Sequence, residues 1–158
     1  MNSRWVCQTQ HKSYKTTQFV GWIAGWKIRA IRRPLLCSAP IADSGGQALR
    51  AGKTYQLRIP KEIPAKQFWS LTLYDHRTWA FIKNPLDRAG LGSSNINQMK
   101  TNPDGSVDLY FGPKAPAGME SNWIPTEDKE PYPWLRLYAP EEPFWNKSFE
   151  MPDVELVK

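Results

Sequence analysis

The chain has 158 residues, a length that suits one domain with a buried core, and its fourteen prolines disfavour long uninterrupted helices. Its formal net charge is +6, but residues 1–37 hold seven Lys and Arg and no acid, whereas residues 38–158 hold fourteen Lys and Arg and all fifteen Asp and Glu. The second part is therefore close to neutral and lacks the charge excess that a nucleic-acid-binding domain carries. We expect no nucleic-acid partner.

The first 37 residues form an atypical basic leader. Within it, FVGWIAGWKIRAIRRPLL (Phe19–Leu36) has an apolar run of about eight residues, well short of the roughly 20 needed to cross a bilayer. Its arginines follow the apolar run, whereas a signal peptide has its positive charges first. A membrane role is therefore not expected, although an interfacial amphipathic anchor stays open. We expect residues 1–37 to be poorly ordered, the domain to span residues 38–158, and the compartment to be periplasmic or cytoplasmic.

Metal-ligand residues are scarce. The chain has two cysteines, Cys7 and Cys37, both in the leader, and two histidines, His11 and His76. This set does not have the spacing of a structural zinc site, so we expect no metal. A disulfide between the cysteines stays open.

From Lys53 onward, apolar and polar residues alternate with the period of two that is typical of half-buried strands. In KTYQLRIP, for example, Tyr55, Leu57 and Ile59 share one face. The segments predicted as strands are 53–60, 68–75, 78–83, 106–112 and 134–140, with 78–83 and 68–75 pairing as a hairpin. Helical periodicity is weak and is best around residues 94–100 and 141–147. The pattern predicts an all-β fold, an antiparallel jelly-roll-like β-sandwich with few short helices.

Polar and aromatic side chains recur on the strand faces opposite the apolar ones. The members of this outward-facing row are Tyr74, Asp108, Tyr110, Arg136 and Tyr138. If their strands are neighbours, a carboxylate, a guanidinium and phenols converge, and such a group can bind a polar or acidic ligand. Ordinary cross-strand pairing on a solvated sheet face is the alternative. Two further ligand-binding candidates, Asn122 and Trp123, are predicted to lie on a loop.

The local motifs that mark common enzyme classes are absent from the sequence, including G-x-S-x-G, the P-loop, G-x-G-x-x-G and H-E-x-x-H. His76 and the carboxylate pair Asp75 and Asp108 are weaker candidates for acid–base chemistry. No catalytic residue or cofactor is assigned, and whether the protein is an enzyme stays open.

From about Asp43 to its C-terminus, the chain resembles the C-terminal domain of the DUF1254/DUF1214 family of bacterial proteins. The pieces that carry the resemblance are, in order, GKTYQLRIP, PAKQFWSLTLYD, IKNPLDR, NPDGSVDLYFGPKAPAG, NWIPT, LRLYAPEEPFW and MPDVE. The resemblance implies a jelly-roll-like β-sandwich that usually follows a separate DUF1254 domain, and it implies no activity. It also implies a structural role for KNPLDR, in which Asn84 closes a turn and Arg88 reaches a buried carbonyl or acid.

Three functions remain open at this point. The preferred one is a C-terminal unit of a larger bacterial protein that supports domain packing or oligomerisation, with an upstream DUF1254-like domain or a second copy as its partner. The alternatives are a part of an enzyme and a binding module for a small polar ligand. A deep pocket holding Tyr74, Asp108 and Arg136 would favour these alternatives, whereas a flat apolar patch would favour docking of a domain or of a second copy.

Overall fold

The computed structural model describes the backbone of residues 5–8, 22–23, 26–27, 35–40, 42–146 and 148–157, and the side chains of residues 39–40, 42–146 and 148–157. The described strands are β1 (Trp5–Gln8), β2 (Trp22–Ile23), β3 (Trp26–Lys27), β4 (Leu35–Pro40), β5 (Tyr55–Ile59), β6 (Ala65–Asp75), β7 (Gly90–Gly92), β8 (Val107–Gly112), β9 (Trp123–Pro125), β10 (Pro131–Pro140) and β11 (Glu155–Leu156). The described helices are the 3₁₀ helices η1 (Ser93–Gln98) and η2 (Glu120–Asn122) and the α-helix α1 (Glu142–Trp145).

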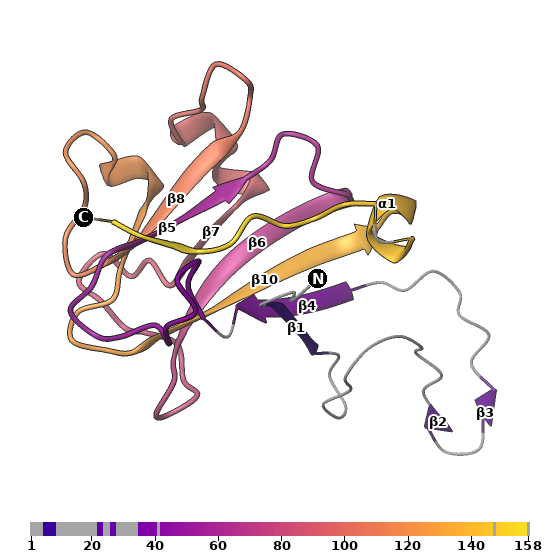
Figure 1. The fold of residues 1–158 in the computed structure, drawn as a ribbon, viewed down its shortest axis with the longest axis horizontal. Coiled ribbons are helices and arrows are strands. Elements are labelled where there is room, and N and C mark those ends of the chain that lie inside the picture. Colours follow the sequence, from indigo (N-terminus) through magenta and orange to yellow (C-terminus); the bar gives the residue numbers. More distant parts are fainter. Residues whose placement is uncertain are drawn as a thin grey trace.

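The strands form two principal sheets (Figure 1). We call the sheet with strand order β1-β4-β10-β6-β7 the long sheet, and the sheet with order β11-β5-β8-β9 the short sheet. Pairing is antiparallel throughout the long sheet, whereas β8 and β9 of the short sheet run parallel. The long strands β6 and β10 lie side by side, as Figure 1 shows, and β2 and β3 form a separate two-stranded sheet.

Both sheets contribute to one hydrophobic core, because alternate residues of their strands point into it. The long sheet supplies Trp69, Leu71, Leu73, Leu135 and Leu137, and the short sheet supplies Tyr55, Leu57, Ile59, Val107, Leu109, Phe111 and Ile124. Burying one apolar side chain of this size contributes about 1.5–3 kcal/mol to folding, so this cluster is the main drive. The predicted all-β class, with its two sandwich-like layers and few short helices, is confirmed.

The local elements follow the sequence pattern with one correction. The helices expected around residues 94–100 and 141–147 are present as η1 and α1, each shorter than predicted. Residues 78–83 do not form the predicted strand: the chain turns back on β6, but only a single bridge forms there, between Tyr74 and Phe81. The reason is that Trp79 has a left-handed backbone conformation (φ 57°), which does not fit a strand.

β4 crosses the predicted domain boundary at residue 38. Residues 35–40 pair with β10 on one side and with β1 on the other, so the long sheet includes residues from the leader. The prediction that residues 1–37 are poorly ordered falls largely outside the described residues and stays a prediction. None of the helices in the described ranges has the length and apolar character needed to span a membrane.

Candidate functional site

The outward-facing row predicted from the sequence is divided between two sheets. Tyr74 lies on β6, and Arg136 and Tyr138 lie on β10, so these three share the outer face of the long sheet. Asp108 and Tyr110 lie on β8, which pairs with β5 and β9 in the short sheet. The condition for convergence of all five side chains is therefore not met, because their strands belong to two sheets and the hydrophobic core lies between the two outer faces.

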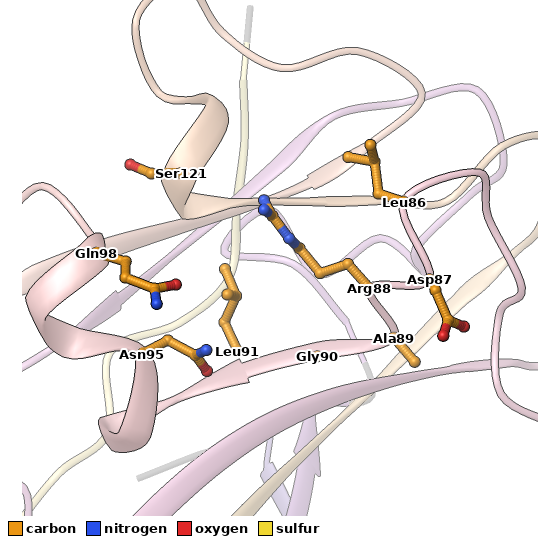
Figure 2. A pocket seen from close by; sticks show the side chains of 9 residues that line it. All are labelled: Leu86, Asp87, Arg88, Ala89, Gly90, Leu91, Asn95, Gln98 and Ser121. Atoms are coloured by element: carbon orange, nitrogen blue, oxygen red, sulfur yellow. The ribbon is translucent and has the colours of Figure 1, made fainter.

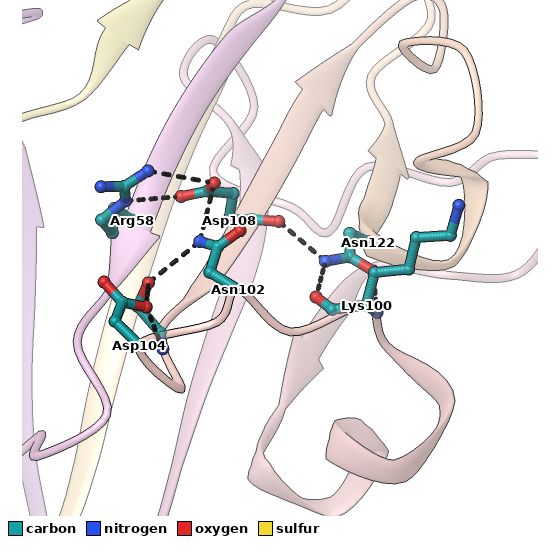
Figure 3. Close-up of polar contacts among 7 residues, drawn as sticks. Arg58, Lys100, Asn102, Asp104, Asp108 and Asn122 are labelled. Atoms are coloured by element: carbon teal, nitrogen blue, oxygen red, sulfur yellow. Dashed lines mark hydrogen bonds and ion pairs between the residues drawn. The ribbon is translucent and has the colours of Figure 1, made fainter.

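Asp108 is engaged by neighbours on the short sheet (Figure 3). Its Oδ1 accepts a hydrogen bond from Arg58 Nε at 2.9 Å, and its Oδ2 accepts from Arg58 Nη2 at 3.3 Å and from Asn102 Nδ2 at 3.0 Å. Burial acts to raise the pKa of Asp108, but hydrogen bonds from Arg58, Asn102 and Gln56 outweigh it and hold this pKa below its ordinary value. The carboxylate is therefore a charged structural partner. Tyr110, on the same face, is buried, and this burial raises the pKa of its phenol.

Asn122 is also a structural residue, because it is 1% exposed and its polar atoms are all paired. Its Oδ1 accepts from the Lys100 backbone N–H at 2.8 Å and from Ser121 Oγ at 2.9 Å, and its Nδ2 donates to the carbonyls of Lys100 at 2.8 Å and Asp108 at 3.0 Å. These four bonds use the whole capacity of an Asn side chain. Figure 3 shows how the bonds of Asn122 to Lys100 and Asp108 join Lys100 to β8. Trp123 begins β9 and donates its indole N–H to the last carbonyl of β8 at 3.0 Å. Asn122 ends η2 and Trp123 begins β9, so the predicted loop placement is corrected, whereas ligand contact by these residues stays a prediction.

Arg136 is held on the outer face of the long sheet by two hydroxyl groups. Its Nη1 donates to Thr72 Oγ1 at 2.8 Å, and its Nη2 donates to the Tyr74 hydroxyl at 2.6 Å. Its guanidinium carbon lies 5.6 Å from the centroid of the Tyr74 ring and 5.8 Å from that of the Trp134 ring, within the range of cation–π attraction. Every Asp and Glu of the chain lies in the described part, and none of them forms an ion pair with Arg136 there. Arg136 is thus a half-buried cation with neutral partners.

Aromatic rings surround this guanidinium. We call the surface the aromatic face, and it consists of Phe68, Thr72, Tyr74, His76, Trp79, Phe81, Tyr132, Trp134, Arg136 and Tyr138. At one end, the rings of Phe68 and Tyr138 stack with centroids 3.8 Å apart, and towards the other end Tyr74 stacks on Phe81 at 4.7 Å. Phe68, Phe81 and Trp79 are 41%, 55% and 57% exposed. The face is therefore apolar, ring-lined and in contact with solvent.

Trp134 adds an unsatisfied donor to this face. It lies opposite Thr72 in the register, and its ring contacts those of Tyr74 and Tyr132. Its Nε1 is buried and has no hydrogen-bond partner among the described residues. Leaving a buried donor unpaired costs about 1–3 kcal/mol.

The turn after β6 presents Trp79 at the edge of the aromatic face. Asp75 closes this turn, because its Oδ1 accepts the Arg77 backbone N–H at 3.1 Å. His76 contacts the Trp79 ring, with centroids 5.7 Å apart. Asp75 and Asp108 lie on different sheets, so the carboxylate pair considered from the sequence does not form.

One hollow, of about 360 Å³, lies beside β7. Figure 2 shows Arg88 extending across it from the loop that precedes β7, and its Nη1 donates to the carbonyls of Glu120 at 2.8 Å and Trp123 at 3.0 Å. Asn84 closes the preceding turn by donating to the Arg88 carbonyl at 2.9 Å and accepting from the Leu86 and Arg88 backbone N–H groups at 3.2 Å. The turn closure predicted for Asn84 is confirmed, and Arg88 reaches two backbone carbonyls, which are part-buried and exposed rather than buried as predicted. The guanidinium in this hollow therefore already has hydrogen-bond partners within the fold.

Another hollow, of about 300 Å³, lies beside Gln56, Arg58 and Glu155 on the short sheet. Arg58 is the partner of Asp108, so its guanidinium is engaged as well. In the part of the chain that the structure describes, no three His, Cys, Asp or Glu side chains lie close enough together to hold a metal ion.

Sequence reasoning missed most of the aromatic face. It placed Tyr74, Arg136 and Tyr138 on outward-facing positions but gave no role to Thr72, Trp79, Phe81 or Trp134. The alternation of β10 already puts Trp134 on the same face as Arg136, which was a usable signal. No signal in the sequence placed Trp79 and Phe81 on this face, because their positions depend on the turn at Trp79 with its left-handed backbone conformation.

The family comparison identifies the domain. The family described as "Protein of unknown function (DUF1214)" matches residues 36–142, about two-thirds of the chain. The chain belongs to the DUF1214 family. The match begins inside β4, in agreement with the pairing of that strand in the long sheet. The DUF1214 resemblance is thus confirmed, whereas the accompanying DUF1254 domain stays a prediction.

Two solved structures resemble this DUF1214 domain. The VPA0106 protein from Vibrio parahaemolyticus is 25% identical with a TM-score of 0.68, over 79% of this chain and 31% of that one. An uncharacterised protein from Burkholderia cenocepacia is 14% identical with a TM-score of 0.43, over 78% of this chain and 29% of that one. The DUF1214 chain therefore spans about a third of the length of these two proteins. No curated protein matches it.

Proposed function

We propose that this DUF1214 chain is a non-catalytic interaction domain that packs through its aromatic face against another domain of a longer protein. The observation that carries the proposal is the set of exposed rings, Phe68, Trp79 and Phe81, on the outer side of the long sheet and the adjoining turn. An outer sheet face that meets only water is normally polar. A contiguous apolar surface marks an interaction site.

The composition of the face also favours a protein partner. Trp, Tyr and Arg are the residues that most often dominate binding energy in interfaces, and they are the main constituents here. In the hollows beside β7 and on the short sheet, by contrast, the guanidinium groups already have partners within the fold: Arg88 donates to backbone carbonyls, and Arg58 pairs with Asp108. A docking function is therefore better supported than the alternative of a small-ligand site or enzyme part.

A further domain suits the face better than a second copy of the chain. In a symmetric dimer the same patch contacts itself, so two faces that each hold an uncompensated Arg136 would be brought together. The VPA0106 protein extends well beyond the third of its length that matches, which supports a domain that accompanies this fold. An upstream DUF1254-like domain is the partner that we propose.

Calorimetry with a separately produced partner tests this proposal. The polypeptide encoded immediately upstream of this chain is titrated into the wild type, into Trp79→Ser/Phe81→Ser and into the control Leu86→Ser/Leu156→Ser. The control residues are 54% and 45% exposed and lie outside the aromatic face. We expect binding to the wild type and the control, and at least about tenfold weaker binding to the aromatic variant, because truncating one interface hot spot costs more than about 1.4 kcal/mol.

Two results would contradict the proposal. One is the absence of binding, or an equal loss in both double variants. The other is a dimer of the chain alone in sedimentation velocity that only the aromatic variant abolishes, since the occupant would then be a second copy.

A further inference from the structure

Arg136 carries a charge that the described fold does not balance. Asp108 and Glu130 form ion pairs with other arginines: Asp108 pairs with Arg58, and Glu130 lies 3.7 Å from both Arg50 and Arg77. The partners of Arg136 are hydroxyl groups and rings, which hold a cation in place without neutralising it.

The guanidinium is fixed and still has donors to spare. The bonds to Thr72 and Tyr74 use two of its five N–H groups and leave three with no partner among the described residues. Fixing the side chain in advance removes much of the rotamer entropy that a binding event would otherwise cost. The buried N–H of Trp134, whose ring lies 5.8 Å from the guanidinium carbon, is a further donor with no partner among the described residues.

We infer that Arg136 is the receptor for a carboxylate, supplied by an acidic side chain of the domain that covers the aromatic face. This inference rests on the proposed docking function and specifies its chemistry. A planar carboxylate matches the fork of a guanidinium and can accept two parallel hydrogen bonds from it. Among the described side chains, those in contact with Arg136 are hydroxyl groups and rings and include no second cation, which favours a group with a single negative charge over a phosphate. The rings further exclude water and thereby strengthen the ion pair.

Titration of the isolated chain with benzoate tests the inference without the partner domain. Benzoate combines a carboxylate with a flat apolar ring, and benzamide is its neutral counterpart of the same shape. The Arg136 Nε–H and Trp134 indole N–H resonances are followed by NMR at constant ionic strength in the wild type, in Arg136→Gln and in the control Arg50→Gln. Arg50 is a suitable control because its side chain is 70% exposed and it lies outside the aromatic face.

We expect saturable shifts with benzoate at millimolar concentration in the wild type and in Arg50→Gln. Relative to benzoate binding by the wild type, we expect benzamide to bind the wild type at least tenfold more weakly. We expect the same loss for benzoate binding to Arg136→Gln. Should Arg136→Gln fail to fold, Thr72→Val/Tyr74→Phe serves instead, because it keeps the charge but releases the guanidinium and should weaken binding several-fold.

The inference would be overturned by any of three results: equal shifts with benzoate and benzamide, benzoate binding that is unchanged in Arg136→Gln, or the absence of a saturable shift. Micromolar benzoate binding would overturn the assignment to a protein side chain, in favour of a free organic acid. The calorimetry with the Trp79 and Phe81 variants measures docking of the partner domain, whereas the benzoate titration measures carboxylate binding at Arg136. The two experiments therefore show separately which of the two proposals fails.

Discussion

Replacing Asn122 with Ala should destabilise the domain by about 3 kcal/mol. The substitution leaves three backbone groups without their partner: the N–H and C=O of Lys100 and the C=O of Asp108. Each orphaned group costs about 1–3 kcal/mol when buried, and we take the lower end because Lys100 lies at the surface and water can reach its backbone. The midpoint of urea unfolding, followed by circular dichroism with an unchanged m-value, measures this loss.

Two companion variants make the reasoning about Asn122 specific. Ser121→Ala removes one part-buried hydrogen bond and leaves the backbone partners of Asn122 in place, so it should cost only about 0.5 kcal/mol. Asn122→Asp sets a carboxylate against the Lys100 and Asp108 carbonyls, which should raise the pKa of that carboxyl in the folded state. Its destabilisation should therefore shrink as the pH falls through the folded pKa. A loss below 1 kcal/mol for Asn122→Ala would refute the view that this residue joins Lys100 to β8.

Three further substitutions test other parts of the fold. Asp108→Asn should cost about 1 kcal/mol at pH 7, since Arg58 is half exposed. Because the folded pKa of Asp108 is lowered, the difference from the wild type should begin to shrink below about pH 4 and be lost as the pH falls through the folded pKa; a pH-independent difference in urea midpoints would exclude the ion pair. Arg88→Ala should cost about 1–2 kcal/mol through its two lost bonds to backbone carbonyls, and an unchanged thermal midpoint would show these bonds to be dispensable. Gly112→Ala should cost about 1–3 kcal/mol, because a Cβ there would lie 2.6 Å from the Thr54 Cα; a stability equal to that of the wild type would contradict this close approach.

Much of the fold could be predicted because it depends on local alternation. The period of two fixed which residues of β5, β6, β8 and β10 enter the core, and all of those assignments hold. The turn at Asn84 and the anchoring role of Arg88 were also predicted, from the family resemblance.

The sequence did not predict how the strands that carry the candidate site residues are distributed between the two sheets. Alternation shows which residues of one strand share a face, but it does not show which strands are neighbours. Asp108 pairs with Arg58, fifty positions away, and Arg136 contacts Tyr74, sixty-two positions away. Partnerships over such separations depend on how the whole core closes. The burial of Asn122 was missed for the same reason, since the groups that it satisfies come from two other segments.

Radical footprinting read by mass spectrometry tests the docking surface most directly. The chain is oxidised alone and in the presence of the upstream-encoded polypeptide, and the oxidation of its exposed apolar residues is compared. Our account predicts that Phe68, Trp79 and Phe81 react in the free chain and become protected in the complex, while Leu86 and Leu156 react equally in both. Protection of Leu86 or Leu156 with no change at Trp79 and Phe81 would place the interface elsewhere and contradict the account.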